Sequence, residues 1–172
     1  MRQAAVKCLA VCAAALMASA CSSDASTPWG TENAIWPSNA TEMVLTNSGG
    51  GFAPPAPTGS ECQSGEDTFT LTVATRNFAW KECQGSGSDP YLFVSDQRVL
   101  SQAEFDGVVE ALRAVTVSTR TGCGADKGSL TLTVTTPTGD HQYLDDFYAC
   151  NHAGTYVSGL DEVFQASQNL AH

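Results

Sequence analysis

Histidines and neighbouring acidic residues are the side chains of this sequence with the chemistry for acid–base or nucleophilic catalysis. The three histidines are His141, His152 and His172. A Ser-His-Asp or Cys-His hydrolase needs a histidine beside its nucleophile, and no nucleophile elbow or Cys-His pattern surrounds these three. Asp145 and Asp146 are adjacent, so within a strand they face opposite sides of a sheet and cannot act on one ligand together. We therefore predict that the chain is not an enzyme.

Two further groups contain residue types that bind metals or phosphates in other proteins. Cys123, Cys150 and His152 have the side chains of a zinc site, but no Cys-x-x-Cys pair is present and the cysteines of an exported chain oxidise. The glycines at 49–51 lead into the prolines at 54–55 rather than into a helix, so they do not form a phosphate cradle. The sequence thus predicts neither a metal nor a cofactor.

The charge distribution argues against nucleic acid as a partner. The 172 residues include 8 basic and 18 acidic side chains, a net charge of −10. Binding to a phosphate backbone needs clustered Lys and Arg, whereas the basic residues here are scattered singly. Without Arg2 and Lys7, which lie in a segment that we expect to be removed, six basic groups stand against 18 acidic ones, giving −12. An acidic surface of this kind mainly favours solubility.

An export signal is predicted over residues 1–20. Arg2 and Lys7 flank the start of a nearly uniform apolar stretch at 8–17, and residues 18–20 are the small side chains that a signal peptidase accepts. As a helix, an apolar stretch of roughly ten residues spans only about half of a bilayer. We therefore expect a cleaved signal rather than a permanent transmembrane helix.

The residues at the predicted cleavage site resemble the lipobox of bacterial lipoproteins. Ala18, Ser19 and Ala20 precede Cys21, with Ala18 where that family usually has Leu. The resemblance implies that the Cys21 thiol carries a lipid with palmitate-type acyl chains and becomes the new N-terminus. It also implies a membrane-attached protein of the cell envelope, and Ser22 after the cysteine implies the outer membrane if the source is Gram-negative.

The number of cysteines favours lipidation over ordinary secretion, which would cleave after Ala20 at the same bond. The chain has seven cysteines, and removal of Cys8 and Cys12 with the signal leaves five. An odd number would leave one reactive thiol in an oxidising compartment, whereas lipidation of Cys21 leaves four that can pair.

The exported part divides into a tether and one domain. Residues 21–40 are rich in Ser, Thr, Asn, Pro and Ala without periodicity, which is typical of a flexible tether. Residues 41–172 are predicted to form the folded domain, with a first strand at about 42–46. The sequence leaves open whether Trp29 and Trp36 pack on this domain.

Two similar segments predict cysteine-bracketed hairpins. Residues 69–73 and 130–134 alternate apolar and hydroxyl side chains, and five of seven positions from 69 recur identically from 130. A turn and a return strand follow each segment. This favours a duplicated unit, although such alternation is also common strand chemistry. Folding each hairpin back predicts two disulfides among three possible pairings, namely Cys62 with Cys83 and Cys123 with Cys150.

Two helices complete the predicted α+β fold. Ser101 and Glu104 form a capping-box pattern before apolar residues at helical spacing, and a shorter apolar pattern begins at Leu160. We expect an antiparallel sheet of the two hairpins, covered on one face by both helices. The other face should then carry the hydroxyl groups of Thr70, Thr72, Thr131 and Thr133.

The order of these features is similar to that of emfourins, which inhibit thermolysin-like metalloproteases. The similarity covers about residues 42–170: a strand into a Gly-Gly-Phe-Ala segment, a capped helix from Ser101, Asp126-Lys127 before a strand, a hairpin and a last helix. It implies an inhibitory loop of Gly49, Gly50, Gly51 and Phe52. This chain departs from the family by its four additional cysteines, its Pro-rich insertion after Phe52 and its lipid anchor.

Two functions follow. The first is a non-catalytic, lipid-anchored envelope protein whose small domain binds an unidentified partner, such as an envelope or secreted protein, a glycan or a small ligand. The alternative is an emfourin-like inhibitor whose partner is a metalloprotease.

Overall fold

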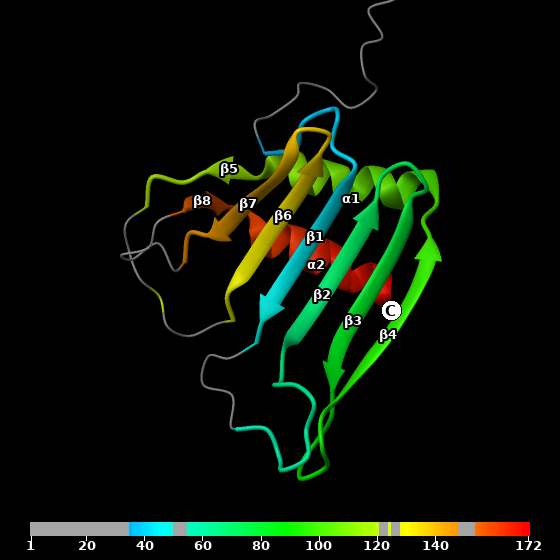
Figure 1. Cartoon of the computed structure of the whole chain (residues 1–172), viewed down its shortest axis with the longest axis vertical. Coiled ribbons are helices and arrows are strands. Elements are labelled where there is room, and N and C mark those ends of the chain that lie inside the picture. The colour runs from blue at the N-terminus through cyan, green and yellow to red at the C-terminus, as the bar shows by residue number, and fades with distance from the viewer. Residues whose placement is uncertain (1–34, 50–54, 121–123, 125–127, 148–153) are drawn as a thin grey trace, which may run out of the picture.

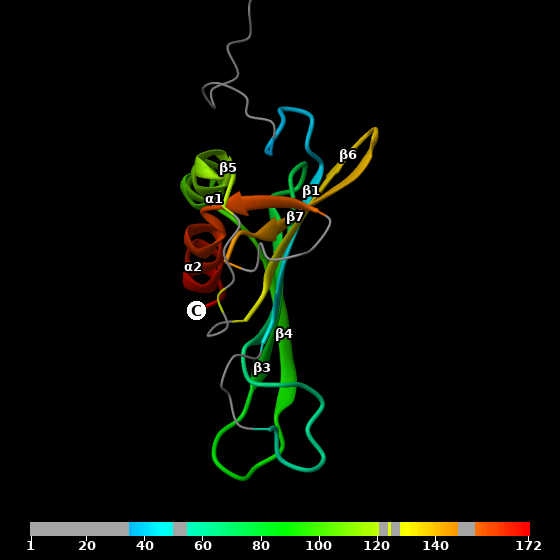
Figure 2. The same cartoon turned by 90° about the vertical axis from the view of Figure 1, so that its left-hand side faces the viewer.

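One eight-stranded sheet and two helices make up the described part of the chain. The computed structural model describes residues 35–49, 55–120, 124, 128–147 and 154–172. Both helices lie on the same face of the sheet, as the edge-on view in Figure 2 shows. The elements are β1 Glu42–Ser48, β2 Glu66–Thr72, β3 Asn77–Gln84, β4 Leu92–Val99, α1 Gln102–Ala114, β5 Thr116–Val117, β6 Leu130–Thr136, β7 Gly139–Asp145, β8 Thr155–Ser158 and α2 Leu160–Ala171 (Figure 1).

The predicted α+β class is confirmed, and the predicted sheet is extended and corrected. The strand order is β4-β3-β2-β1-β6-β7-β8-β5, with β1 paired antiparallel to both β2 and β6. The two predicted hairpins are present, but β4, β5 and β8 were not expected. A wholly antiparallel sheet is also wrong in one place, because β7 and β8 pair in parallel.

Alternation of side chains determines which face of the central strands is buried. Met43 and Leu45 of β1, Phe69 and Leu71 of β2, and Leu132 of β6 are fully buried on the helix side. Register joins them across the sheet, since Leu45 lies opposite both Phe69 and Leu132. Burial of such side chains contributes roughly 1.5–3 kcal/mol each. The apolar alternation in the sequence therefore correctly predicted the face that the helices cover.

Helix α1 begins with the predicted capping box. The Ser101 hydroxyl accepts a hydrogen bond from the Glu104 N–H at 3.3 Å, and a Glu104 carboxylate oxygen accepts one from the Ser101 N–H at 2.8 Å. Helix α2 has no side-chain cap at its start, where Gly159 has a φ of 97°. The apolar faces of both helices pack on the sheet; their buried residues are Phe105, Val108, Val109, Leu112, Leu160 and Val163.

The segment before β1 packs into the same core. Ile35 and Trp36 are 2% and 5% exposed, and Ala40 is also buried. Residues 35, 36 and 40 therefore belong to the core, although the sequence assigned them to the tether. The periodicity that marks strands and helices is missing from residues 35–40, and this is why the sequence left the packing of Trp36 open. Trp29 lies outside the described residues.

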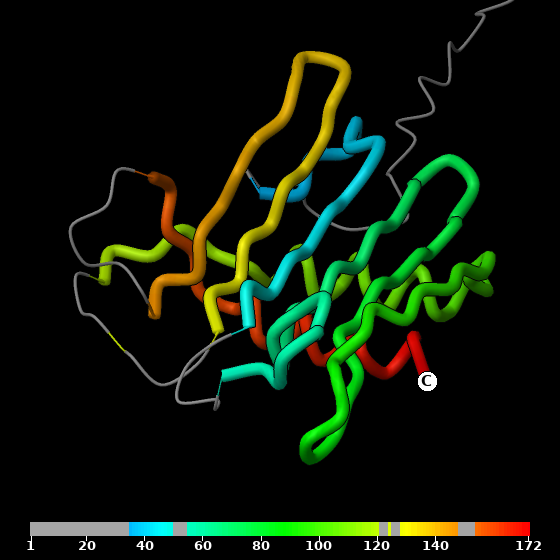
Figure 3. Tube along the Cα trace, turned by 60° about the horizontal axis from the view of Figure 1, so that its bottom comes forward, coloured from blue at the N-terminus to red at the C-terminus, as the bar shows by residue number. Residues whose placement is uncertain are grey.

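The structure does not confirm the predicted duplication. Strands β2 and β6 run in the same direction and turn Phe69 and Leu132 toward the same helices, but β3 lies on one side of β1 and β7 on the other (Figure 3). When β2 is superposed on β6 so that both strand direction and buried face match, β3 and β7 lie on opposite sides of the superposed strands. The two hairpins consequently cannot be superposed as copies of one unit.

Candidate functional site

The face of the sheet opposite the helices carries rows of hydroxyl groups. Thr46 lies between Thr68 and Thr131, and in the next row Val44 lies between Thr70 and Thr133. These side chains alternate with the buried apolar residues of β1, β2 and β6, so they point away from the helices. Neighbouring strands are spaced about 4.8 Å apart, which sets the spacing of the hydroxyls along a row. We call this surface the open face.

A shallow hollow of about 500 Å³ lies on the open face over β2, β3 and β4. Thr68, Thr70, Lys81, Ser95 and Gln97 provide its polar side chains, and Ala79 leaves its floor low. The Lys81 ammonium lies 3.7 Å from the centre of the Phe93 ring, a cation–π contact that holds this flexible side chain. Hydroxyl, amide and ammonium groups can bind a polar ligand here.

The base of the predicted inhibitory loop is closely packed. Gly49 is buried, has a φ of +65°, and a Cβ at this position would lie 2.9 Å from the Ser64 carbonyl oxygen. Its N–H donates to the Asn47 side-chain oxygen at 3.3 Å. Only glycine therefore fits the position, and Gly49 anchors the loop rather than projecting from it. Gly50, Gly51 and Phe52 lie outside the described residues.

The predicted Cys62–Cys83 disulfide is confirmed, with 5.8 Å between the two Cα atoms. It connects the segment before β2 to the end of β3, as folding the first hairpin back on itself predicted. Cys123, Cys150 and the predicted lipid-attachment residue Cys21 lie outside the described residues, so the second disulfide and the lipid anchor stay predictions.

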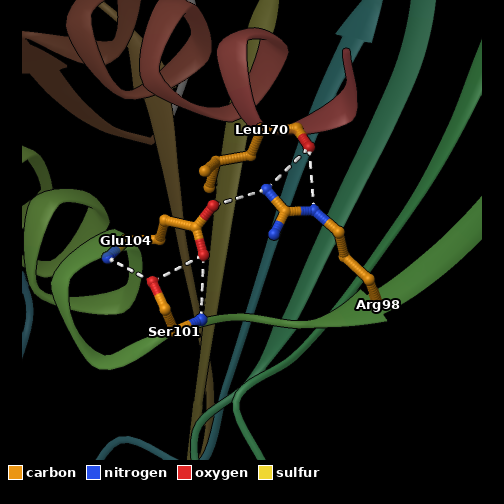
Figure 4. A network of polar contacts seen from close by, with 4 residues as sticks. All are labelled: Arg98, Ser101, Glu104 and Leu170. Carbon is orange, nitrogen blue, oxygen red and sulfur yellow. Dashed lines mark hydrogen bonds and ion pairs between the residues drawn. The ribbon is translucent and has the colours of Figure 1, made fainter.

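A polar network joins β4 to both helices (Figure 4). The Arg98 guanidinium donates to the Leu170 carbonyl oxygen from both Nε and Nη2 at 3.2 Å, and Nη2 lies 2.9 Å from a Glu104 carboxylate oxygen. Hydrogen bonds from Arg98 and then from Ser101 lower the pKa of Glu104 to about 2. Arg98 thus connects the start of α1 to the end of α2, and we assign the network to stability.

A buried carboxylate pair was missed in the sequence. Asp67 and Glu82 lie opposite each other on β2 and β3 and are both buried. Burial, followed by the charge of Glu82, raises the pKa of Asp67, and the Cys83 N–H acts in the opposite direction. His172 Nε2 lies 3.6 Å from a Glu82 oxygen. The sequence could have indicated that Asp67 is buried, because Asp67 precedes the buried Phe69 by two residues and therefore lies on the same face of β2.

The other acidic and histidine candidates do not form a joint site. Asp145 accepts a hydrogen bond from the Phe147 N–H at 2.8 Å, and Asp146 accepts one from the Ser118 hydroxyl at 2.6 Å. His141 is exposed, and His152 lies outside the described residues. In the ranges that the structure describes, no three His, Cys, Asp or Glu side chains come together as a metal site requires.

Comparison of the chain with protein-family models, curated proteins and solved structures found no match. The lipobox and emfourin resemblances accordingly stay predictions from the sequence. Of the two helices in the described ranges, neither has the length and apolar composition needed to cross a bilayer.

Proposed function

We propose that this chain is a non-catalytic, lipid-anchored protein of the cell envelope that binds a polar partner through its open face. The observation that carries the binding role is the row pattern of threonines beside a hollow with Lys81 and Gln97. Export and lipidation rest on the signal-like segment at 1–20 and on Cys21. The Cys62–Cys83 disulfide supports the same proposal, because structural disulfides persist in oxidising compartments.

The chemistry of the open face favours a ligand with many hydroxyl or amide groups. A threonine hydroxyl donates one hydrogen bond and accepts others, and the Gln97 amide does both. The face offers no large apolar patch at its centre, where Val44 is flanked by Thr70 and Thr133. Each hydrogen bond to such a ligand contributes only about 1 kcal/mol, so several must act together. An envelope glycan, with repeated hydroxyl and amide groups, is the partner that fits this pattern best.

The binding role is tested by co-sedimentation of the unlipidated protein with insoluble cell-wall glycan. We expect the double variant Thr70→Val, Thr133→Val to keep its thermal stability and to lose about tenfold in affinity, because two hydroxyls are removed at nearly constant side-chain shape. Thr119→Val, an exposed threonine away from the strands, is the matched control. Equal sedimentation of all three proteins at all glycan concentrations would exclude the open face.

The lipid anchor is tested separately. Cys21→Ser should move the protein from the membrane fraction to the soluble fraction, because the acyl chains provide most of the membrane affinity. Cys12→Ser, within the predicted signal, should leave the membrane fraction unchanged. Membrane attachment of the Cys21→Ser protein after cleavage would contradict lipidation at this residue.

Inhibition of a metalloprotease is the second candidate, and the packing of Gly49 favours it. The backbone at Gly49 is fixed between Ser64 and Gly128, since a Cβ on Gly128 would lie 2.9 Å from the Gly49 carbonyl oxygen. A fixed base lowers the entropy that an inhibitory loop loses on binding. Titration against a thermolysin-like protease, with a serine protease as control, should give stoichiometric inhibition of the metalloprotease alone. Phe52→Ala should weaken it, and absence of inhibition by the wild-type protein would eliminate this function.

A further inference from the structure

A second cavity lies on the helix side, at the end of the sheet where β2 turns into β3. Its volume is about 320 Å³, within the range of small-molecule pockets. Three parts of the chain form it: the segment before β1, the β2–β3 turn and α1 (Figure 1). Trp36, Phe105 and Val109 provide apolar surface, and Arg76, Gln102 and Arg113 provide polar groups. This cavity is separate from the open face, which lies on the other side of the sheet.

The charged side chains that line the cavity are both basic. Arg76 and Arg113 belong to a chain with a net charge of −10, and no Asp or Glu is among the lining residues. The Arg76 Nη1 donates to the Gln102 side-chain oxygen at 3.2 Å. Gln102 in turn donates to Asp106 at 2.6 Å, which fixes the orientation of its amide. Among the described residues, no carboxylate forms an ion pair with Arg76. The cavity is thus suited to an anionic group.

The backbone of Arg76 is in a conformation that arginine rarely adopts. Its φ is 53°, and it is the one non-glycine residue with positive φ in the described part of the chain. The left-handed region costs an L-residue roughly 1–2 kcal/mol, and glycine would avoid that cost. In this conformation the Arg76 carbonyl oxygen accepts a hydrogen bond from the Leu100 N–H at 2.9 Å. Strained residues of this kind cluster at ligand sites. An arginine here is explained if its guanidinium binds a ligand.

We propose that this cavity binds a small amphiphilic carboxylate. The carboxylate contacts the guanidinium of Arg76, whose planar donors match its two oxygens. The apolar body packs against Trp36, Phe105 and Val109. The Gln102 side-chain oxygen accepts a hydrogen bond from the Arg76 guanidinium and so orients it. The site requires neither the lipid anchor nor the open face.

The proposal is tested by calorimetric titration of the Cys21→Ser mature chain with 4-phenylbutyrate. The matched probes are 4-phenylbutan-1-ol, which is neutral, and 4-phenylbutylamine, which is cationic. We expect the carboxylate to bind at least about tenfold more tightly than the alcohol, since hydrogen bonds to a charged group are stronger than those to a neutral one. The amine should show no binding. Equal affinity for the carboxylate and the alcohol would overturn the proposal. Absence of carboxylate binding would overturn it as well.

The decisive variant is Arg76→Gly. It removes the guanidinium and also the backbone strain, so we expect a melting temperature equal to or above that of the wild type together with a loss of about tenfold or more in carboxylate affinity. Arg120→Gln is the matched control, because Arg120 is exposed and does not line the cavity. Carboxylate affinity of wild-type strength in the Arg76→Gly protein would refute the assignment. Thr70→Val, Thr133→Val should leave this affinity unchanged, which separates the cavity from the proposed glycan surface.

Discussion

The hairpins β2–β3 and β6–β7 contain similar seven-residue segments, at 69–75 and 130–136, yet they have different surroundings in the structure. Both place apolar residues under the helices on either side of β1. The first hairpin has the Cys62–Cys83 disulfide, continues into β4 and turns through Arg76 at positive φ. The second turns at Gly139, with a φ of 130°, and is followed by the short strand β8. Local alternation therefore specifies a strand and its buried face, while packing with distant segments specifies its neighbours.

Of the substitutions that compare the two hairpins, the one that removes the aromatic contacts of the first hairpin should have the largest effect on stability. The Phe69 ring lies 6.0 Å from that of Phe78 and 5.6 Å from that of Phe164, between centroids. Leu130, which corresponds to Phe69 when the two similar sequence segments are aligned, is also buried but has no ring. Phe69→Ala should lower the free energy of unfolding by about 4 kcal/mol and Leu130→Ala by about 3 kcal/mol. Urea denaturation measures both, and a larger loss for Leu130→Ala would mean that the second hairpin is the better-packed half.

The disulfide of the first hairpin gives the next effect. Cys62→Ala with Cys83→Ala removes a cross-link between residues 21 positions apart, which should cost about 3 kcal/mol in the chain-entropy model. In that model the disulfide stabilises the fold by lowering the entropy of the unfolded chain. Amide exchange through global unfolding should therefore accelerate equally in β2 and β6. Acceleration confined to β2 and β3 would show instead that the disulfide prevents local opening of the first hairpin.

These two regions also show how far the sequence predicts the fold. The buried faces, the capping box at Ser101 and the Cys62–Cys83 pair were predictable, because each depends on residues close in the chain. Strand β4 was not, since most of its residues are exposed on the sheet edge and lack alternation. The parallel pairing of β8 with β7 depends on distant packing that no local pattern encodes.

The candidate sites divide in the same way. The threonines of the open face follow from alternation, and the sequence placed them correctly opposite the helices. The cavity at Arg76 joins segments near residues 36, 76 and 105, which are distant in the sequence and carry no shared motif. Nothing in the sequence marks Arg76 as a residue at positive φ, because a glycine or asparagine would be the usual signal there.

The cap of α1 is a smaller test, because it involves exposed groups after the first hairpin and β4. Ser101→Ala should cost about 1 kcal/mol, since it removes the acceptor for the Glu104 N–H. Because the pKa of Glu104 is lowered from 4.5 to about 2, its ionised form stabilises the fold above pH 4.5, and this contribution is lost as the pH falls toward 2. Thermal melts of the wild type and of Glu104→Gln should therefore converge over that range; a constant difference would mean that Glu104 does not act through its charge.

The smallest expected effect is a gain in stability at Asp67. In the aligned sequence segments Gly128 corresponds to Asp67, so the second hairpin has no carboxylate at this position, and its buried carboxylate is Asp145 at the end of β7. The pKa of Asp67 is raised above 3.8, so above that pH the unfolded chain releases its proton more readily and the fold loses stability. Asp67→Asn stays neutral and should melt at a higher temperature than the wild type at pH 7, with no advantage below pH 3.8. Asp89→Asn, at an exposed position, is the control and should change little. A lower melting temperature for Asp67→Asn at pH 7 would mean that the hydrogen bond from the Cys83 N–H to the carboxylate outweighs burial and the charge of Glu82. The Asp67–Glu82 pair would then stabilise the first hairpin.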